Sequence, residues 1–478
     1  MEDLLHGYVG AYTRSPQWLK TWIGGVYSRL PVRLRYGAGY AAFDAETRLR
    51  DPEVIAQLAD EKLKATLTWA AQTVPAYAHL KALVREPGSA RRWLVEFPLL
   101  EKSTLKADEA SQLSRAVPRA RRLLTHTGGS TSIPMRLHLE KHVSRSKDFA
   151  YNRAFDRIAG IGSDDLVLAL RGRTVPGAER HDGPVWMFDP IKRYVHLSSD
   201  HLEAEHMPRY MQALRHWKPR FVHAYPSALY PIARWLDAHP DPSITAPVRS
   251  VQLFSENVYD YQVALIRKVF DCPVLLEYGH SERAVKAVSL PDDPRYHFWP
   301  LYGHVELIAL DANRPCAPGE LGEIVATGFD NRVLPLIRYR TGDLAVRSLQ
   351  APSLPGVDFV AERIEGRVQE FLVCNDRRLV SITTIGAAHF HELAASERMQ
   401  FVQERPGHAI LKVQTRAPLS AAARASLEHG IREKTQGGLS VDVVETDTIA
   451  RTVSGKERLL VQQLDISNFL GASLHEAA

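Results

Sequence analysis

The first candidate for ligand chemistry is a run of small residues at 125–134, THTGGSTSIP. Its glycines let the backbone turn tightly and approach a ligand, and its hydroxyls and exposed N–H groups suit phosphate oxygens. It is not a Walker loop, because no Gly-Lys-Ser/Thr follows the glycines. In isolation such a run is more often an ordinary flexible turn. A phosphate site here is therefore a hypothesis that other segments must support.

A second group of polar residues follows the apolar run 274–278, VLLEY, which is typical of a buried strand. Ligands of open α/β sheets collect outside the carboxyl ends of the strands. Tyr278 could supply an aromatic wall for a purine, and the Glu282 carboxylate could hold Mg²⁺ against phosphate oxygens. The alternative is a capped turn with a surface glutamate. Ser255 and Glu256 end another expected strand and could line the same crevice.

Three charged residues further along the chain directly follow glycines: Asp343, Arg367 and Lys456. The Asp343 carboxylate could accept both hydroxyls of a ribose, or it could form a turn and pair with Arg340. Taken alone, the segments around Arg367 and Lys456 are also typical of solvated, charged loops.

In this order and spacing, the segments resemble the core motifs of the adenylate-forming superfamily, which comprises acyl- and aryl-CoA synthetases, luciferases and peptide-synthetase adenylation domains. The closest resemblance is to the phenylacetate-CoA ligase-like branch, particularly its members associated with capsular and exopolysaccharide biosynthesis. It spans most of the chain and includes the segments 97–102, FPLLEK, and 224–227, AYPS. The resemblance implies a two-step reaction. A carboxylate attacks the α-phosphate of ATP to give an acyl-adenylate and pyrophosphate, and a nucleophile then displaces AMP.

The resemblance also implies a role for individual residues. Lys456 would bridge the carboxylate and the α-phosphate, Glu282 would bind Mg²⁺, and Arg367 would lie beside the nucleotide at a domain junction. Asp343 would take the ribose hydroxyls, and Tyr278 would stack near adenine. The other nucleotide-binding residues would be Thr127, Gly128, Gly129, Ser130, Thr131, Ser255, Glu256, Gly279, His280 and Ser281.

Candidate contacts for the carboxylic acid substrate are less well defined. His223, Tyr225 and Ser227 follow an expected strand and precede an expected helix, where the superfamily places substrate contacts. His223 could equally be a satisfied core residue. His126, beside the phosphate loop, could orient the substrate carboxylate or cap the loop.

Two positions depart from the superfamily pattern. Ser132 stands where the phosphate loop usually has glycine. The hinge position, which is often Asp or Lys in this superfamily, is Gln369. The segment 374–380, CNDRRLV, also differs from the stretch that helps to form the thiol channel in CoA ligases. Three functions stay open: an ATP- and Mg²⁺-dependent ligase with a thiol acceptor such as CoA, an amide ligase with an amino sugar or amino acid acceptor, and a non-catalytic nucleotide-binding homologue.

Composition narrows the protein class. The 478 residues are 45% hydrophobic and 24% charged with a net charge of +5, which excludes a disordered chain and implies no nucleic-acid partner. The densest basic stretch, 115–122, is expected to be a solvated face; contact with an acidic membrane surface stays open. Three separated cysteines favour neither disulfides nor a cysteine zinc site. With no signal-peptide pattern and no membrane span, we expect a cytoplasmic protein.

The pattern of elements predicts an α/β protein. Residues 1–110 are expected to be largely helical, and strands at 166–170, 221–224, 251–254 and 274–278 alternate with helices such as 261–270. Short strands at 305–310, 322–327 and 336–339 indicate a β-rich, antiparallel or barrel-like subdomain. We expect a large N-terminal domain, 1–365, that binds the nucleotide and the acyl group. A small, mobile α+β domain, 366–478, would follow and carry Lys456.

Overall fold

The computed structural model describes residues 16–126, 135–171, 175, 178, 180, 183–199, 202, 204–310, 312–367, 370–385, 396–415, 418–449 and 458–469. Among these residues, no helix is both long and apolar enough to cross a membrane.

The N-terminal part is helical, as its apolar spacing predicts. The longest helix, α6 (Pro52–Thr73), begins where Asp51 accepts hydrogen bonds from the backbone N–H groups of two following residues. Its buried face, with Leu63 and Leu67, packs in one apolar cluster with Phe329 and Ile337 of the β-rich part. The other helices are α3 (Gln17–Arg29), α4 (Val32–Tyr36), α5 (Tyr40–Glu46), α7 (Ala90–Leu94), α8 (Lys102–Ala107) and α9 (Glu109–Gln112).

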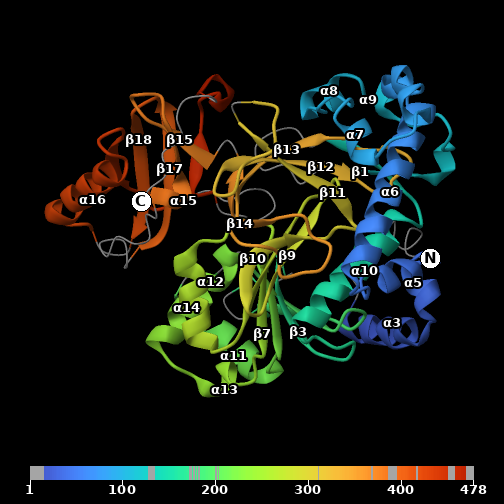
Figure 1. Cartoon of the computed structure of the whole chain (residues 1–478). Helices are drawn as coiled ribbons and strands as arrows, with labels where there is room; N and C mark the ends of the chain where they lie inside the picture. Colours follow the sequence, from blue (N-terminus) through green and yellow to red (C-terminus); the bar gives the residue numbers. More distant parts are fainter. Residues whose placement is uncertain are drawn as a thin grey trace.

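One long sheet runs through the centre of the molecule (Figure 1). In its described part it has 12 strands in the order β11-β12-β13-β14-β10-β9-β8-β7-β6-β3-β5-β4. Strands β5, β3, β6, β7 and β8 pair in parallel, and the other pairs are antiparallel. The parallel strands and β4 are β3 (Val167–Leu170), β4 (Trp186–Asp189), β5 (Tyr194–Leu197), β6 (Phe221–Ala224), β7 (Ser250–Phe254) and β8 (Val274–Gly279).

Helices cover both faces of the parallel strands (Figure 1). On one face, side chains such as Leu229 and Ile266 of the helices pack on Val222 and Leu253 of the strands. On the other face, Phe155 packs on strand residues in a separate cluster. The covering helices are α10 (Ser144–Ile158), α11 (Met207–Trp217), α12 (Pro226–Ala238), α13 (Pro242–Thr245) and α14 (Asp260–Phe270). The four expected strands and the crossover helix α14 are thus confirmed.

The β-rich part continues the same sheet. Its strands are β9 (Lys286–Leu290), β10 (Asp293–Phe298), β11 (Gly303–Ala309), β12 (Leu321–Gly328), β13 (Tyr339–Arg347) and β14 (Val360–Arg367). Antiparallel pairing was expected, but the strand predicted at 336–339 was wrong. Strand β13 begins at Tyr339 and runs through Gly342, whose positive φ of 76° accommodates a bulge opposite β12.

Helix α3 lies against β4, one of the two edge strands of the long sheet. Gly24 permits this approach, because a Cβ there would lie 2.7 Å from the ring of Pro190. The Lys20 ammonium also donates to the sulfur of Met187 at 3.2 Å.

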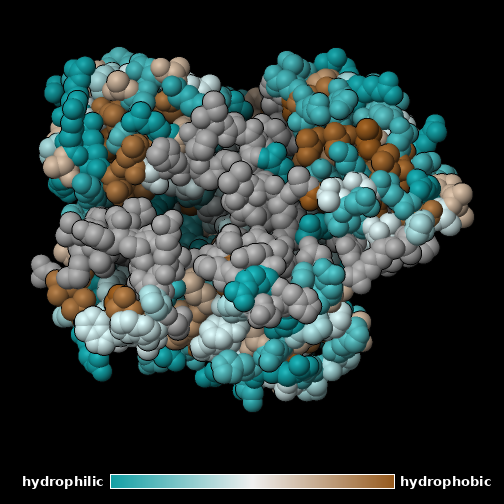
Figure 2. Space-filling model, turned by 180° about the vertical axis from the view of Figure 1, so that it is seen from behind, coloured by the Kyte–Doolittle hydropathy of each residue, from teal (hydrophilic) through white to brown (hydrophobic). Residues whose placement is uncertain are grey.

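The last quarter of the chain forms a separate lobe (Figure 1). A four-stranded sheet in the order β19-β18-β17-β20 packs against α16 (Ala421–Lys434) around Phe401, Leu411 and Leu427. From behind, a notch at the top of the view separates this lobe from the N-terminal helices (Figure 2). The other elements are β15 (Phe371–Val373), β16 (Leu379–Ser381), α15 (Ile382–Ile385), β17 (Ser396–Arg405), β18 (His408–Thr415), β19 (Ser440–Glu445) and β20 (Leu460–Gln462).

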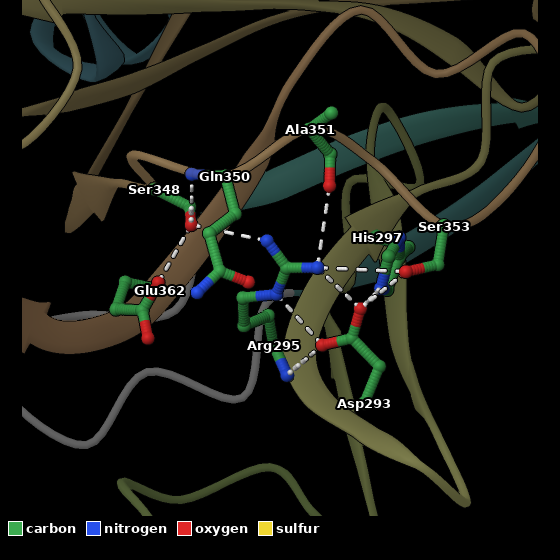
Figure 3. Close-up of polar contacts among 8 residues, drawn as sticks. All are labelled: Asp293, Arg295, His297, Ser348, Gln350, Ala351, Ser353 and Glu362. Atoms are coloured by element: carbon green, nitrogen blue, oxygen red, sulfur yellow. Dashed lines mark hydrogen bonds and ion pairs between the residues drawn. The ribbon is translucent and has the colours of Figure 1, made fainter.

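A buried polar network holds the loop that connects β13 to β14 against strand β10 (Figure 3). The Arg295 guanidinium donates to both oxygens of Asp293, at 2.7 and 2.6 Å. Asp293 also accepts from Ser353 at 2.7 Å and lies 3.0 Å from the His297 ring nitrogen. Because β10 pairs with β14, this network stabilises the part of the sheet that leads to the candidate site.

Replacing Asp293 by Asn should destabilise the protein by about 3 kcal/mol, because it leaves the buried Arg295 cation without its carboxylate. The urea midpoint of the full chain measures this loss. The exposed neighbour Asp292, changed to Asn, is the matched control and should leave the midpoint unchanged. Equal effects of the two substitutions would contradict a stabilising role for the network.

Candidate active site

The carboxyl ends of β6, β7 and β8 open onto one cavity of about 1570 Å³. Strands β13 and β14 contribute to another wall, and the C-terminal lobe contributes to a third. Twelve of the predicted site residues line this cavity: His223, Tyr225, Ser227, Ser255, Glu256, Tyr278, Gly279, His280, Ser281, Glu282, Asp343 and Arg367.

The remaining predicted site residues cannot be placed in the cavity. Residues Thr127, Gly128, Gly129, Ser130, Thr131, Gln369 and Lys456, and the departure Ser132, lie outside the described residues. His126 ends β1 (Arg122–His126), which pairs with β2 (Arg136–Glu140), but its side chain is outside the described set. The two strands flank the glycine-rich run on either side.

Asp343 is held by two partners on the cavity wall. The Tyr278 hydroxyl donates to one carboxylate oxygen at 2.8 Å, and the Arg367 guanidinium lies 3.4 Å from the other. The pairing of β13 with β14 sets Asp343 directly opposite Arg367. The alternative pairing of Asp343 with Arg340 does not occur, because Arg340 bonds instead to Glu101 and Glu323, each at 2.7 Å. A sequence-distant trio thus offers both acceptor and donor atoms to a polar ligand.

Glu282 is a buried but ionised carboxylate. The Tyr339 hydroxyl donates to one of its oxygens at 3.0 Å, and the His280 ring lies 3.2 Å from the other. Burial alone would raise the pKa of Glu282. The opposite effect of His280, a backbone hydrogen bond and Lys102 is larger and brings the pKa to about 2. The carboxylate is therefore charged at neutral pH.

Lys102 is a cavity residue that we did not predict from the sequence. Burial lowers the pKa of its ammonium, while the Glu282 carboxylate acts in the opposite direction. Leu100 pairs with β13 next to Tyr339, exchanging backbone hydrogen bonds of 2.9 and 3.0 Å with Arg338 and Arg340. Because of this pairing, helix α8, which begins at Lys102, starts at the cavity wall. In the sequence, Lys102 belongs to the segment 97–102, which was part of the family resemblance but to which no function was assigned.

Glu256 caps helix α12. Its carboxylate accepts from the Ser227 backbone N–H at 3.1 Å and from the Ser227 hydroxyl at 3.0 Å. An anion at a helix N-terminus is favourable, because the unsatisfied N–H groups there carry partial positive charge. Ser255, just before it, adopts a left-handed φ of 63° that turns the chain out of β7. The Ser227 hydroxyl, predicted to contact substrate, is thus engaged by Glu256 in this structure.

The chain crosses from the long sheet to the C-terminal lobe beside Arg367. The Asn257 side-chain amide donates to Glu370 on the far side of the crossing and to the Glu365 carbonyl oxygen at 3.3 Å. Gly366, at φ 92°, lies against both side chains, and a Cβ there would collide with Glu370 and Asn257. Burial raises the pKa of Glu370 to about 7; Asp343 also raises it, and Arg367 lowers it.

A magnesium ion fits this donor set in one specific way. Among the described residues, no three His, Cys, Asp or Glu side chains form a metal-binding group. Mg²⁺ commonly binds through one or two protein carboxylates together with phosphate oxygens and water. The ionised Glu282, which lines the cavity, suits that mode.

Comparison with known proteins defines the fold. No protein-family model matches the sequence. Protein CapK of Staphylococcus aureus is 25% identical over 283 residues, 58% of this chain. The match spans 60% of CapK, less than two thirds of its length.

Two crystal structures of 2-hydroxyisobutyryl-CoA ligase are similar in fold. In the postadenylation state, with R3-HIB-AMP, that ligase matches with a TM-score of 0.63 at 17% identity, over 87% of this chain and 91% of its own. In the thioesterification state, with 2-HIB-AMP and CoA, the TM-score is 0.50 at 17% identity, over 87% and 91% of the two chains. The chain therefore has the α/β fold of the adenylate-forming ligases, a class of enzymes, as the sequence motifs indicated.

The Glu370 carboxyl should make the folded protein less stable as the pH rises. Its pKa is about 7 when folded against an ordinary value of 4.5, so the folded state binds the proton more tightly. The free energy of unfolding should therefore fall between these two values. Glu370→Gln removes this titration. The melting temperature of the variant minus that of the native protein should therefore increase as the pH rises from about 5 to 8.

The exposed Glu404, changed to Gln, is the matched control and should show no pH-dependent difference from the native protein. A Glu370→Gln difference that stays constant over this pH range would show that Glu370 does not titrate there.

Proposed function

We propose that the protein is an ATP-dependent, AMP-forming carboxylate ligase. The observation that carries the proposal is the convergence of the ionised Glu282 with Asp343, Tyr278 and Arg367 on one cavity, in a fold whose similar structures hold acyl-adenylates. Anionic and cationic groups meet there at the carboxyl edge of parallel strands, where ligands of such sheets bind.

The residues of the cavity suit the charge changes of adenylation. The Asp343 carboxylate would accept hydrogen bonds from ribose hydroxyls while Tyr278 and Arg367 hold it in place. Glu282 would hold Mg²⁺, which neutralises the charge of the phosphates. The hydroxyls and glycines of 127–131 would contact the phosphates, and Lys456 would bridge the carboxylate and the α-phosphate. Displacement at phosphorus leaves little covalent work to the protein, so positioning and charge dominate.

Residues 366–478 would act as a mobile lid with Gln369 at its hinge. The two TM-scores come from one ligase in two states, and this chain is more similar to the postadenylation state. That difference supports a lobe that changes its position between half-reactions.

The second half-reaction would transfer the acyl group to a thiol such as CoA. The similar structures are CoA ligases, and one of them holds CoA. An amine acceptor is the second candidate, favoured by the segment 374–380, which differs from the stretch that helps to form the thiol channel in CoA ligases. The three cysteines, none of which forms a disulfide in the described part of the chain, accord with the reducing cytoplasm, where we propose that the reaction takes place.

Exchange of labelled pyrophosphate into ATP, measured across a panel of carboxylic acids, tests the first half-reaction. Addition of CoA or amino sugars, followed by measurement of AMP release, then separates the thiol acceptor from the amine. ATP binding without exchange for any acid would indicate a non-catalytic homologue and would overturn the proposal.

Glu282→Gln should reduce the exchange rate on the order of 10²-fold, because it removes the anion that would hold the metal ion. Glu428→Gln is the matched control: it makes the same change on the exposed face of α16, away from the cavity, and should leave the rate unchanged. A Glu282→Gln variant with the native rate would remove Glu282 from the mechanism.

Lys456→Ala should reduce exchange on the order of 10²- to 10³-fold while ATP still binds, because the lysine is expected to act on the displacement rather than on the nucleotide. Calorimetry with ATP and the exchange assay measure the two effects separately. Native exchange in this variant would contradict the assigned role.

A further inference from the structure

The cavity contains a cation that no described carboxylate neutralises. Arg171 directly follows β3 and lines the cavity, with its guanidinium carbon 4.9 Å from the centre of the Phe254 ring. Within the described part of the chain, no Asp or Glu forms an ion pair with it, although the side chain is exposed to the cavity. An Arg stacked on an aromatic ring keeps its N–H donors free at the edge of the guanidinium plane.

The neighbouring acids already have partners of their own. Three such contacts are present: Glu277 with Lys286, Asp156 with Arg153, and Glu256 with Ser227. Glu277 and Asp156 are therefore each balanced by another cation, and the Glu256 carboxylate is engaged by Ser227.

His223 lies beside the same ring. Its ring centre is 4.0 Å from that of Phe254, and neither of its buried nitrogens has a hydrogen-bond partner among the described residues. A carboxylate oxygen of Glu277, which pairs with Lys286, lies 4.0 Å from Nε2. Burial, and secondly the charge of Arg171, lower the pKa of His223 well below its usual value, so the ring is neutral. A buried polar group without a partner costs free energy unless a ligand satisfies it. His223 can supply one donor and one acceptor to such a ligand.

This subsite lies at some distance from the adenylation residues. Gly279 ends β8, and Arg171 follows β3, which is three strands away in the order β8-β7-β6-β3. Neighbouring strands are about 4.8 Å apart, so the two ends are separated by about 14 Å along the sheet edge. Because the Arg171 side chain reaches back to Phe254 at the end of β7, its charge lies between them.

We propose that the carboxylic acid substrate carries a second anionic group, a distal carboxylate, which binds to the Arg171 guanidinium and the His223 ring. This inference rests on the proposed function, since the first carboxylate is the one that would be adenylated. An arginine binds a carboxylate through two parallel N–H bonds, which gives both affinity and orientation. Phe254 would support the guanidinium from behind.

The experiment compares dicarboxylic acids of roughly four to eight carbons, a range set by the strand spacing, with monocarboxylic acids of equal length. Pyrophosphate exchange gives kcat/KM for each acid. A charge-assisted hydrogen bond contributes about 1.5–3 kcal/mol, so the dicarboxylic acid should be preferred by about 10- to 100-fold. Arg171→Glu should abolish this preference and favour ω-amino acids of the same length instead.

Arg249→Glu is the matched control. Arg249 is exposed and lies just before β7, at the opposite end of the sheet from the cavity, so the native preference should persist. An equal kcat/KM for mono- and dicarboxylic acids in the native protein, or an unchanged preference in Arg171→Glu, would overturn the proposal.

Calorimetry of dicarboxylate binding separates this inference from the proposed function. If no acid supports exchange, the ligase assignment fails. Dicarboxylate binding that is lost in Arg171→Glu and kept in Arg249→Glu would still support the subsite. Absence of dicarboxylate binding to the native protein, together with exchange on monocarboxylic acids, would overturn the subsite and leave the ligase assignment intact.

Discussion

The candidate site depends on the antiparallel pairing of β13 with β14. This pairing places the Asp343 carboxylate opposite Arg367 and next to the Tyr278 hydroxyl. The left-handed Gly366 is part of this strand pair, and the bulge at Gly342 lies where the same strand β13 pairs with β12. A shift of one residue would turn Asp343 to the other face of the sheet, because side chains alternate along a strand. The buried Asp293–Arg295 pair stabilises the next strand, β10, and so supports the register.

The cavity concentrates charges that would be costly to bury alone. Removing a charge from water is unfavourable unless an opposite charge or hydrogen bonds compensate. Glu282 and Asp343 each have such partners, and the effect on Glu282 is a low pKa. Glu370 is buried with less compensation, and its pKa is raised instead. Two carboxyl groups of one cavity thus have opposite protonation behaviour near neutral pH.

Much of the architecture could be predicted from local patterns. The parallel strands are continuous apolar runs, and α14 has clear helical spacing, so periodicity identified both. The strand at 336–339 was misplaced because Gly342 indicates a turn locally, whereas pairing with both neighbouring strands keeps the chain extended.

The residues of the site likewise divide into those that local motifs identify and those that only long-range contacts bring to the cavity. Glu282 and Asp343 follow recognisable motifs. The approach of Lys102 to Glu282 depends on a pairing between segments more than 230 residues apart, Leu100 with Tyr339, which no local pattern reveals. Arg171 was missed for a similar reason. Its lack of a carboxylate partner among the described residues is a property of the folded surroundings rather than of its neighbours in sequence.

The position of α3 has a consequence for self-association. Strand β4 is at the end of the long sheet, and an uncovered edge strand offers unpaired N–H and C=O groups to another chain. Helix α3, brought close by Gly24, lies against that strand. A shortened protein that begins after this helix would retain Asp343, Tyr278 and Arg367, yet strand β4 would lose this neighbour and could pair with the sheet of another molecule.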